Sequence, residues 1–159
     1  MSKQKWDLKE HFCAIAQYLR RPFIKDDIAV LKLDAPLLLG ENIVPVELPQ
    51  NDFLPYCQML HFAGWGYTQN DIKEPLLRFM DFTIKAPNTS DYMNNVFDDR
   101  LFNAVDILGI QTPNQGDSGG PLVLNNVVYG VLSGEWADDV AAFINVYRYL
   151  DFIKTAIEL

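Results

Sequence analysis

The run Gly116-Asp117-Ser118-Gly119-Gly120-Pro121 constrains this chain more than any other stretch. It sets a serine among glycines, and glycine permits the tight turns that point two backbone N–H groups at one spot. A serine hydroxyl is a weak nucleophile until a base takes its proton, and the oxyanion formed by its attack needs N–H donors close by. The motif therefore predicts a nucleophile at Ser118 and an oxyanion hole made by the amides of Gly116 and Ser118.

The residues after the motif decide between two folds that use such a serine. In the α/β-hydrolase elbow a helix follows the serine, and an acid and a histidine come later. Here residues 122–132 read as two strands joined by Asn125-Asn126, a dipeptide typical of a tight hairpin turn. No histidine follows Ser118. The elbow is therefore excluded.

Four blocks in one order resemble the chymotrypsin/trypsin-like serine proteases. The nucleophile motif matches theirs as it stands, and the other three agree in kind: Asp27-Ile28-Ala29-Val30-Leu31-Lys32-Leu33, Ala63-Gly64-Trp65-Gly66, and Asn145-Val146-Tyr147 with Tyr149, Phe152 and Ile153. The resemblance implies an all-β fold, a chymotrypsin-like double β-barrel with an incomplete first barrel and a C-terminal helix. The chain would be one N-terminally truncated domain, with the partial first barrel in about 1–50, the second barrel in about 56–145 and the helix in 146–159.

The resemblance also implies roles for residues around Ser118. Asp27 would orient the catalytic base, with Asp26 as the alternative, and Thr112, Ser133 and Glu135 would line the substrate pocket. Thr112 stands where trypsin-like members have aspartate, so a preference for Lys or Arg is not supported. Glu135 either sets a carboxylate at the pocket mouth or is a solvated loop residue.

Asp117 is linked to activation by the same resemblance, because active members pair this aspartate with a new N-terminal amine. The sequence holds no Ile-Val-Gly-Gly-like segment that could supply such an amine. Burying an unpaired charge is costly. We therefore expect the oxyanion loop to be zymogen-like or mobile.

The resemblance also implies a histidine as the catalytic base, and the sequence offers no good candidate for it. The chain has only His11 and His61, and neither lies in a Thr-Ala-Ala-His-Cys-like motif. Both are better explained as surface or packed histidines than as the base. Removing the histidine of a serine protease triad costs about a millionfold in kcat. The chain is thus expected to be inactive by itself, whether as part of a longer serine endopeptidase, a non-catalytic homologue that binds protein, or a relic.

Composition limits the remaining possibilities. With 13 basic and 21 acidic side chains the net charge is −8, so neither nucleic acid nor an anionic membrane is an expected partner. A protein or peptide is expected instead. Cys13 and Cys57 are too few for a disulfide framework, and Asn114 and Leu124 stand where the family has cysteines. We expect no metal and no cofactor. The family resemblance implies an extracellular location, although no signal peptide is recognisable.

Hydrophobic patterning gives coarse elements. We expect a largely buried strand at 28–33, an edge strand at 44–48, a strand leading from Cys57 into Ala63, a bulged strand at 76–86 and further strands at 104–111 and 142–146. Residues 8–19 fit either a helix or a strand. An apolar stripe through Tyr149, Leu150, Ile153 and Ile157 predicts an amphipathic terminal helix.

Overall fold

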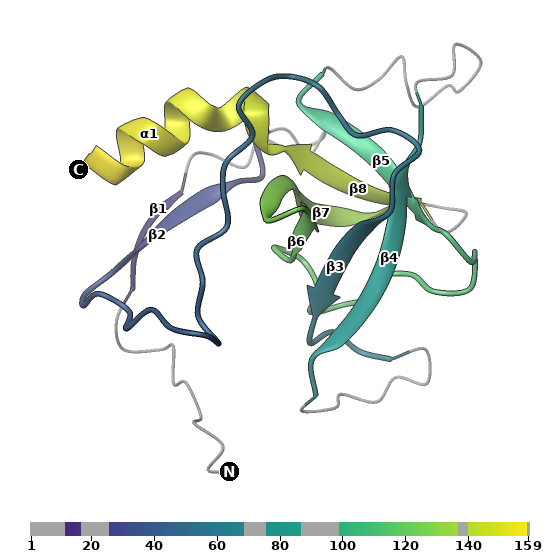
Figure 1. The fold of residues 1–159 in the computed structure, drawn as a ribbon, viewed down its shortest axis with the longest axis horizontal. Helices are drawn as coiled ribbons and strands as arrows, with labels where there is room; N and C mark the ends of the chain where they lie inside the picture. The colour runs from purple at the N-terminus through teal and green to yellow at the C-terminus, as the bar shows by residue number, and fades with distance from the viewer. Residues whose placement is uncertain (1–11, 17–25, 69–75, 87–98, 137–139, 159) are drawn as a thin grey trace.

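A computed structural model describes residues 12–16, 26–68, 76–86, 99–136 and 140–158 (Figure 1). The chain is mostly strand and ends in a helix. Its elements are β1 (Phe12–Ala16), β2 (Ala29–Leu33), β3 (Leu60–Gly64), β4 (Arg78–Ile84), β5 (Leu101–Asp106), β6 (Pro121–Leu124), β7 (Val127–Trp136), β8 (Val140–Asn145), the 3-10 helix η3 (Val146–Tyr149) and α1 (Leu150–Glu158).

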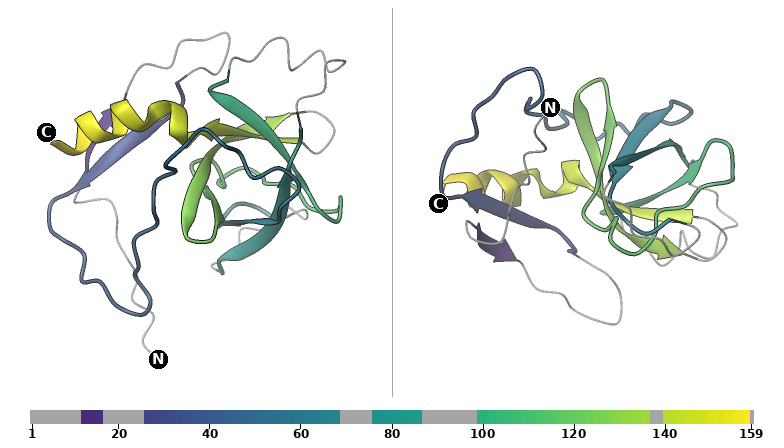
Figure 2. Two further views of the ribbon diagram at one scale, coloured as in Figure 1. Left: turned by 45° about the horizontal axis from the view of Figure 1, so that its top comes forward. Right: turned by 90° about the horizontal axis from the view of Figure 1, so that it is seen from below.

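Six strands form a closed barrel in the order β3-β4-β5-β8-β7-β6, with every neighbouring pair antiparallel. The ring closes where His61 and Phe62 of β3 lie opposite Val123 and Leu122 of β6. A closed barrel leaves no free edge among its own strands. Figure 2 shows this barrel beside the β1–β2 pair, with the terminal helix extending over that pair.

The barrel is filled by phenylalanines that meet edge to face. The rings of Phe62, Phe82 and Phe143 lie 5.8–6.0 Å apart between centroids, within the range preferred by aromatic pairs. Phe102 stacks on Phe143 from β5. The other buried members of this core are Leu60, Ile84, Ala104, Leu122, Leu132 and Ala141.

Strand β8 is buried on both faces and leads into η3 and the terminal helix α1. Phe143 points into the barrel, while its neighbour Ile144 belongs to a second apolar cluster on the outside. Val146, Tyr149 and Ile153 of η3 and α1 pack in that cluster, together with Ile28 and Val128. The predicted amphipathic helix is confirmed, with a preceding 3-10 turn whose start is capped by Asn145.

The hairpin that follows the nucleophile motif is also confirmed. Asn125 and Asn126 have φ angles of 49° and 64°, the left-handed pair that a tight two-residue hairpin requires. Glu47 pairs with this hairpin through Val127, by N–H···O bonds of 2.7 and 3.0 Å to Asn126 and from Val128. The edge strand predicted at 44–48 is therefore reduced to a single bridge.

Two further strand predictions were wrong in detail. β2 was expected to be largely buried, but Leu31 and Leu33 are 53% and 37% exposed because β2 pairs with β1 alone in a two-stranded sheet. β4 was expected to be bulged, but its register with β3 and β5 is regular. Its inward residues are Met80, Phe82 and Ile84, so the outward Phe79 had obscured a simple alternation.

Strand boundaries shifted elsewhere. β5 begins at Leu101 and ends at Asp106, earlier than the predicted strand at 104–111. Its continuation turns because the Asp106 carboxylate accepts hydrogen bonds from the N–H groups of Ile110 and Gln111 at 2.9 and 3.1 Å. Of the ambiguous N-terminal segment, the backbone of 12–16 is a strand, and the remaining residues of 8–19 lie outside the described ranges.

Candidate active site

The nucleophile loop connects β5 to β6 and exposes Ser118. Gly116 has a φ of +99°, which a residue with a side chain rarely adopts. The loop is fixed by backbone bonds from Asp117 N–H to the Asn114 carbonyl (3.0 Å) and from Gly119 N–H to the Leu132 carbonyl (2.8 Å). Among the described residues, the N–H groups of Gly116 and Ser118 donate to no acceptor. The oxyanion hole expected at these two amides stays a prediction.

Asp117 is buried beneath this loop, and its carboxylate accepts hydrogen bonds from two backbone N–H groups. Its Oδ1 accepts a hydrogen bond from Gly66 N–H at 2.7 Å, and its Oδ2 accepts one from Asn114 N–H at 3.0 Å. Its side chain is pressed against the turn that follows β3. A Cβ on Gly64 would lie 1.9 Å from Oδ1, and a Cβ on Gly66 would lie 2.4 Å from Cγ. Only glycines fit these two positions.

The two adjacent aspartates before β2 have different partners. Asp27 Oδ2 accepts a hydrogen bond from the Ser133 hydroxyl at 2.7 Å, which connects it to β7. Asp26 has a positive φ of 62° and accepts hydrogen bonds from Arg100 (2.7 Å) and from the Tyr149 hydroxyl (2.9 Å). Asp26 is therefore engaged with the terminal helix region, and Asp27 remains the candidate for the triad.

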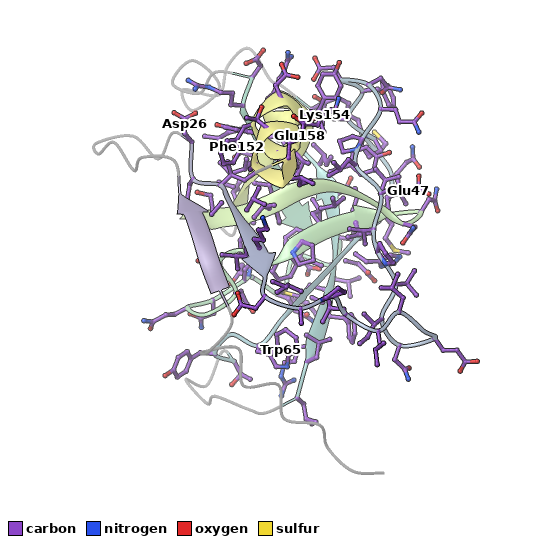
Figure 3. The ribbon with its side chains drawn as sticks, turned by 90° about the vertical axis from the view of Figure 1, so that its left-hand side faces the viewer. Asp26, Glu47, Trp65, Phe152, Lys154 and Glu158 are labelled. Atoms are coloured by element: carbon purple, nitrogen blue, oxygen red, sulfur yellow. The ribbon has the colours of Figure 1, made fainter. Side chains whose placement is uncertain are left out.

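Tyr149 is the described residue whose ionisation responds most to this arrangement. Burial raises the pKa of the Tyr149 hydroxyl well above its ordinary value, and the hydrogen bond to the Asp26 carboxylate raises that pKa further. The phenol thus stays protonated and donates to Asp26. Figure 3 shows Asp26 beside α1. Trp65, which lies between Gly64 and Gly66, is well below α1 in the same view.

His61, the histidine within the described ranges, pairs with Asp81 and not with Asp27. His61 Nδ1 lies 2.7 Å from Asp81 Oδ1, across the β3–β4 ladder, and its side chain is 58% exposed. It is a surface histidine paired with a carboxylate. His11 lies outside the described ranges.

The predicted pocket residues are only partly described. Thr112 is half-buried in the loop before the motif, and Ser133 is engaged by Asp27. The backbone of Glu135 lies in β7, but its side chain lies outside the described set. Whether these residues bind substrate stays a prediction.

Asn114 and Leu124, which stand where the family has cysteines, make different kinds of contact. Asn114 Nδ2 donates to the Thr68 carbonyl at 3.5 Å, which connects the nucleophile loop to the segment after the glycine turn. Leu124 packs against the barrel core. Cys57 is an exposed free thiol, and the side chain of Cys13 is outside the described set.

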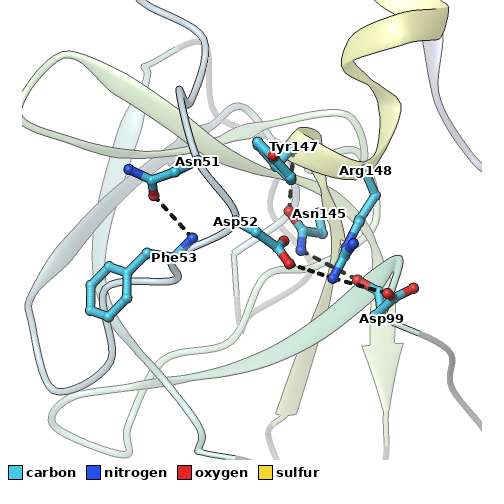
Figure 4. Close-up of polar contacts among 7 residues, drawn as sticks. All are labelled: Asn51, Asp52, Phe53, Asp99, Asn145, Tyr147 and Arg148. Atoms are coloured by element: carbon cyan, nitrogen blue, oxygen red, sulfur yellow. Dashed lines mark hydrogen bonds and ion pairs between the residues drawn. The ribbon is translucent and has the colours of Figure 1, made fainter.

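A second polar cluster braces the barrel at the start of the terminal helix (Figure 4). Arg148 of η3 pairs with Asp52 from the segment before β3 and, at 2.9 Å, with Asp99 just before β5. Asn145 donates to the Asp99 carbonyl and accepts from Tyr147 N–H. These contacts connect η3 to the segments that precede β3 and β5.

Within the described ranges there is no group of three or more His, Cys, Asp or Glu side chains suited to a metal ion. A separate search of the same residues finds no helix long and apolar enough to cross a membrane.

Sequence reasoning missed two contributors to the site. The seating of Asp117 by Gly64 and Gly66 was signalled by two glycines flanking one residue directly after a strand, the pattern of a close backbone approach. The bond from Ser133 to Asp27 spans 106 positions, and no local pattern could reveal it.

Comparison with known proteins identifies the class. The sequence matches the Trypsin family model over residues 2–157, so the chain belongs to the trypsin family and carries a trypsin-like serine protease domain. It is 29% identical to vitamin K-dependent protein C of Oryctolagus cuniculus over 98% of this chain, and 32% identical to brachyurin of Leptuca pugilator over 83% of this chain. The structure is similar to that of the scabies mite inactivated protease paralogue S-I1, with a TM-score of 0.76 at 22% identity over 93% of this chain.

The chain spans only part of these proteins. It covers 39% of protein C, 61% of brachyurin and 68% of the mite paralogue. The chymotrypsin-like fold predicted from the sequence is confirmed.

Proposed function

We propose that this chain is part of a longer serine endopeptidase and carries its nucleophile and oxyanion loop, but does not hydrolyse peptides by itself. The proposal rests on one contrast. Ser118 is exposed beside two amides without acceptors among the described residues, whereas the described histidine, His61, bonds Asp81 on the neighbouring strand.

The chemistry explains why this contrast matters. Attack of Ser118 Oγ on a peptide carbonyl requires a base to take the hydroxyl proton and later return it to the leaving amine. Asp27, held by Ser133, would orient such a base but cannot replace it. The oxyanion amides and substrate binding alone retain only a residual rate, about 10³ to 10⁴ over water in a serine protease without its triad.

This chain covers only part of its relatives, which supports the proposal that the catalytic base belongs to a part of the longer protein outside this sequence. In the longer protein the substrate would be a protein or peptide, bound beside Thr112 and Ser133. An extracellular location is proposed by family resemblance alone.

A second candidate, a non-catalytic homologue that binds protein, is favoured by one comparison. The mite protein is an inactivated protease paralogue, so this fold also occurs in a protease described as inactivated. Under this candidate, residues 29–46 should be as well ordered as the barrel. Protected amides in that segment of the isolated chain would favour the homologue over the fragment.

Labelling with a fluorophosphonate probe tests the proposal. Purified chain 1–159 and its Ser118→Ala variant would be incubated with the probe and read by intact mass, beside an active trypsin as positive control. We expect no labelling above the variant while circular dichroism shows a cooperatively folded chain. Rapid labelling confined to Ser118 would refute the absence of a base and return attention to His11.

A further inference from the structure

A small pocket lies between the segment before β3 and strand β7. Its walls come from residues 47–51 of that segment and from Val127 and Tyr129 of β7, and its volume is about 190 Å³. None of the described residues that line it belongs to the candidate active site. Figure 3 shows Glu47, at one end of the pocket wall, on the opposite side of the view from Asp26.

Backbone hydrogen bonds fix both walls of this pocket. Glu47 N–H donates to the Asn126 carbonyl at 2.7 Å, and Val128 N–H donates to the Glu47 carbonyl at 3.0 Å. The Asn126 side chain donates a further hydrogen bond of 3.4 Å to the Pro45 carbonyl. Pro49 is buried, and its ring restricts the backbone between the two ends of the wall. The pocket is therefore preformed, because the hairpin of the barrel holds its walls.

The pocket presents hydrogen-bond acceptors and one negative charge. Among the described residues, the Glu47 carboxylate has no partner, and the Gln50 side chain and the Tyr129 hydroxyl have none either. Asn51 Oδ1 accepts a hydrogen bond from Phe53 N–H at 3.0 Å, which orients the Asn51 amide (Figure 4). No Lys or Arg is among the described residues that line the pocket. These groups favour a cation and repel an anion.

The volume limits the ligand to a group the size of a side chain. Pockets that bind drug-sized ligands measure about 300 to 1,000 Å³, and this one is smaller. A cavity of about 150 Å³ is enough to bind benzene. Leu48 and Val127 add apolar surface on which a methylene stem can pack.

We propose that this pocket binds the side chain of an arginine from a partner protein. Arginine fits better than lysine, because its planar guanidinium has five donors that reach a carboxylate and amide oxygens together. The chain's net charge of −8 attracts a basic partner. An exposed ion pair contributes little by itself, so useful affinity requires neighbouring contacts from the partner. This inference goes beyond peptide hydrolysis and does not depend on it.

An NMR titration of the uniformly ¹⁵N-labelled chain with N-acetyl-arginine methylamide tests the proposal. We expect saturable shifts of the amides of Glu47, Gln50 and Tyr129, with a Kd of about 1 to 10 mM, as for one exposed ion pair. The citrulline analogue replaces the guanidinium by a neutral urea of similar shape. It should bind at least about fivefold more weakly.

Glu47→Gln removes the charge and keeps the shape of the side chain. Because Glu47 is exposed, the chain should still fold, and its affinity for N-acetyl-arginine methylamide should fall at least about fivefold. Glu41→Gln is the matched control, since Glu41 is also exposed but does not line the pocket. Both variants change the net charge equally, so an affinity within about twofold of wild type in Glu41→Gln separates the pocket from the overall field.

Three results would overturn the inference. The first is no saturable shift of the pocket amides up to about 50 mM, well above the expected Kd. The second is equal affinity for the citrulline analogue. The third is shifts confined to the amides around Ser118 and Ser133, which would place the guanidinium in the candidate substrate pocket.

The comparison of the two ligands on the wild-type chain decides even if a variant fails to fold. Ser118→Ala should bind N-acetyl-arginine methylamide as the wild type does. Failure of the proposed serine chemistry is therefore distinguishable from failure of this inference.

Discussion

At the scale of residues, the adjacent Asp26 and Asp27 show how neighbouring carboxylates acquire different tasks. Asp26 faces Arg100 and Tyr149, whereas Asp27 faces Ser133. The positive φ of Asp26 turns the chain between them. The two side chains can therefore be tested separately.

Ser133→Ala should destabilise the fold by about 1 kcal/mol, the usual value for one hydrogen bond, because Asp27 loses its donor. Urea denaturation of the two chains gives the difference in the free energy of unfolding. Ser118→Ala makes the same chemical change at an exposed hydroxyl with no partner among the described residues, so it should shift stability by less than about 0.5 kcal/mol. Equal losses in both variants would contradict the assignment.

Tyr149 predicts a loss of stability at alkaline pH. Unfolded tyrosine ionises near pH 10, whereas burial and Asp26 raise the pKa of Tyr149 in the folded chain. The neutral phenol's contribution is therefore complete below about pH 10 and declines as pH rises from there toward the raised folded pKa. Urea midpoints at pH 8 and 10.5 should fall less steeply for Tyr149→Phe than for wild type. Tyr147→Phe is the control, because the Tyr147 hydroxyl has no partner among the described residues; a wild-type slope in Tyr149→Phe would refute the prediction.

At the scale of elements, the terminal helix packs against the rest of the chain through one face. Ile153 is 9% exposed in the outer cluster, whereas Ile157 on the same helix is 66% exposed. Ile153→Ala should cost about 2 to 4 kcal/mol, as expected when a buried isoleucine is truncated. Ile157→Ala should cost less than about 0.5 kcal/mol. Thermal or urea unfolding of both variants compares the two positions, and similar costs would show that the helix does not dock as described.

Sequence patterning succeeded where an element's neighbours are close in the chain. The Asn125-Asn126 hairpin and the helix stripe follow from local turn chemistry and periodicity. It failed where burial depends on a distant partner. The apolar run of β2 predicted a buried strand, yet burial also requires a covering layer, and β2 pairs with β1 alone.

The candidate site was likewise predicted where its residues are close in sequence and missed where they are far apart. The motif itself identified Ser118, Gly116 and Asp117 as one loop, because its glycines encode the turn. The partners of Asp26 and Asp27 come from β7, from η3 and from the residue just before β5, more than 70 positions away. No period or spacing in one sequence connects such positions, so these contacts required coordinates.

At the scale of the whole molecule, the region before the barrel presents an unusual apolar surface. Several large side chains of residues 31–46 are exposed, including Leu38 at 91% and Leu39 at 64%. Exposed apolar patches favour association. We expect the isolated chain to self-associate, and Leu38→Lys combined with Leu39→Lys to weaken that association at least about tenfold.

Sedimentation velocity over a range of concentrations would measure the change. Phe79→Lys adds a lysine at an exposed apolar position on β4, in the barrel and outside residues 31–46, and should leave association unchanged. A purely monomeric wild-type chain would contradict the expectation.

The nucleophile motif, residues 116–121, is also part of the barrel's own structure. Five of its six residues have a structural part: Gly116 takes a positive φ, Asp117 accepts a hydrogen bond from Gly66 N–H, Gly119 N–H donates to the Leu132 carbonyl, Gly120 lies against Phe62, and Pro121 begins β6. Selection for a folded barrel would therefore be enough to keep these five residues in a trypsin-like chain that has no catalytic activity. Of the six residues, only Ser118 would be kept for its chemistry. The motif by itself therefore does not distinguish an active protease from an inactive one.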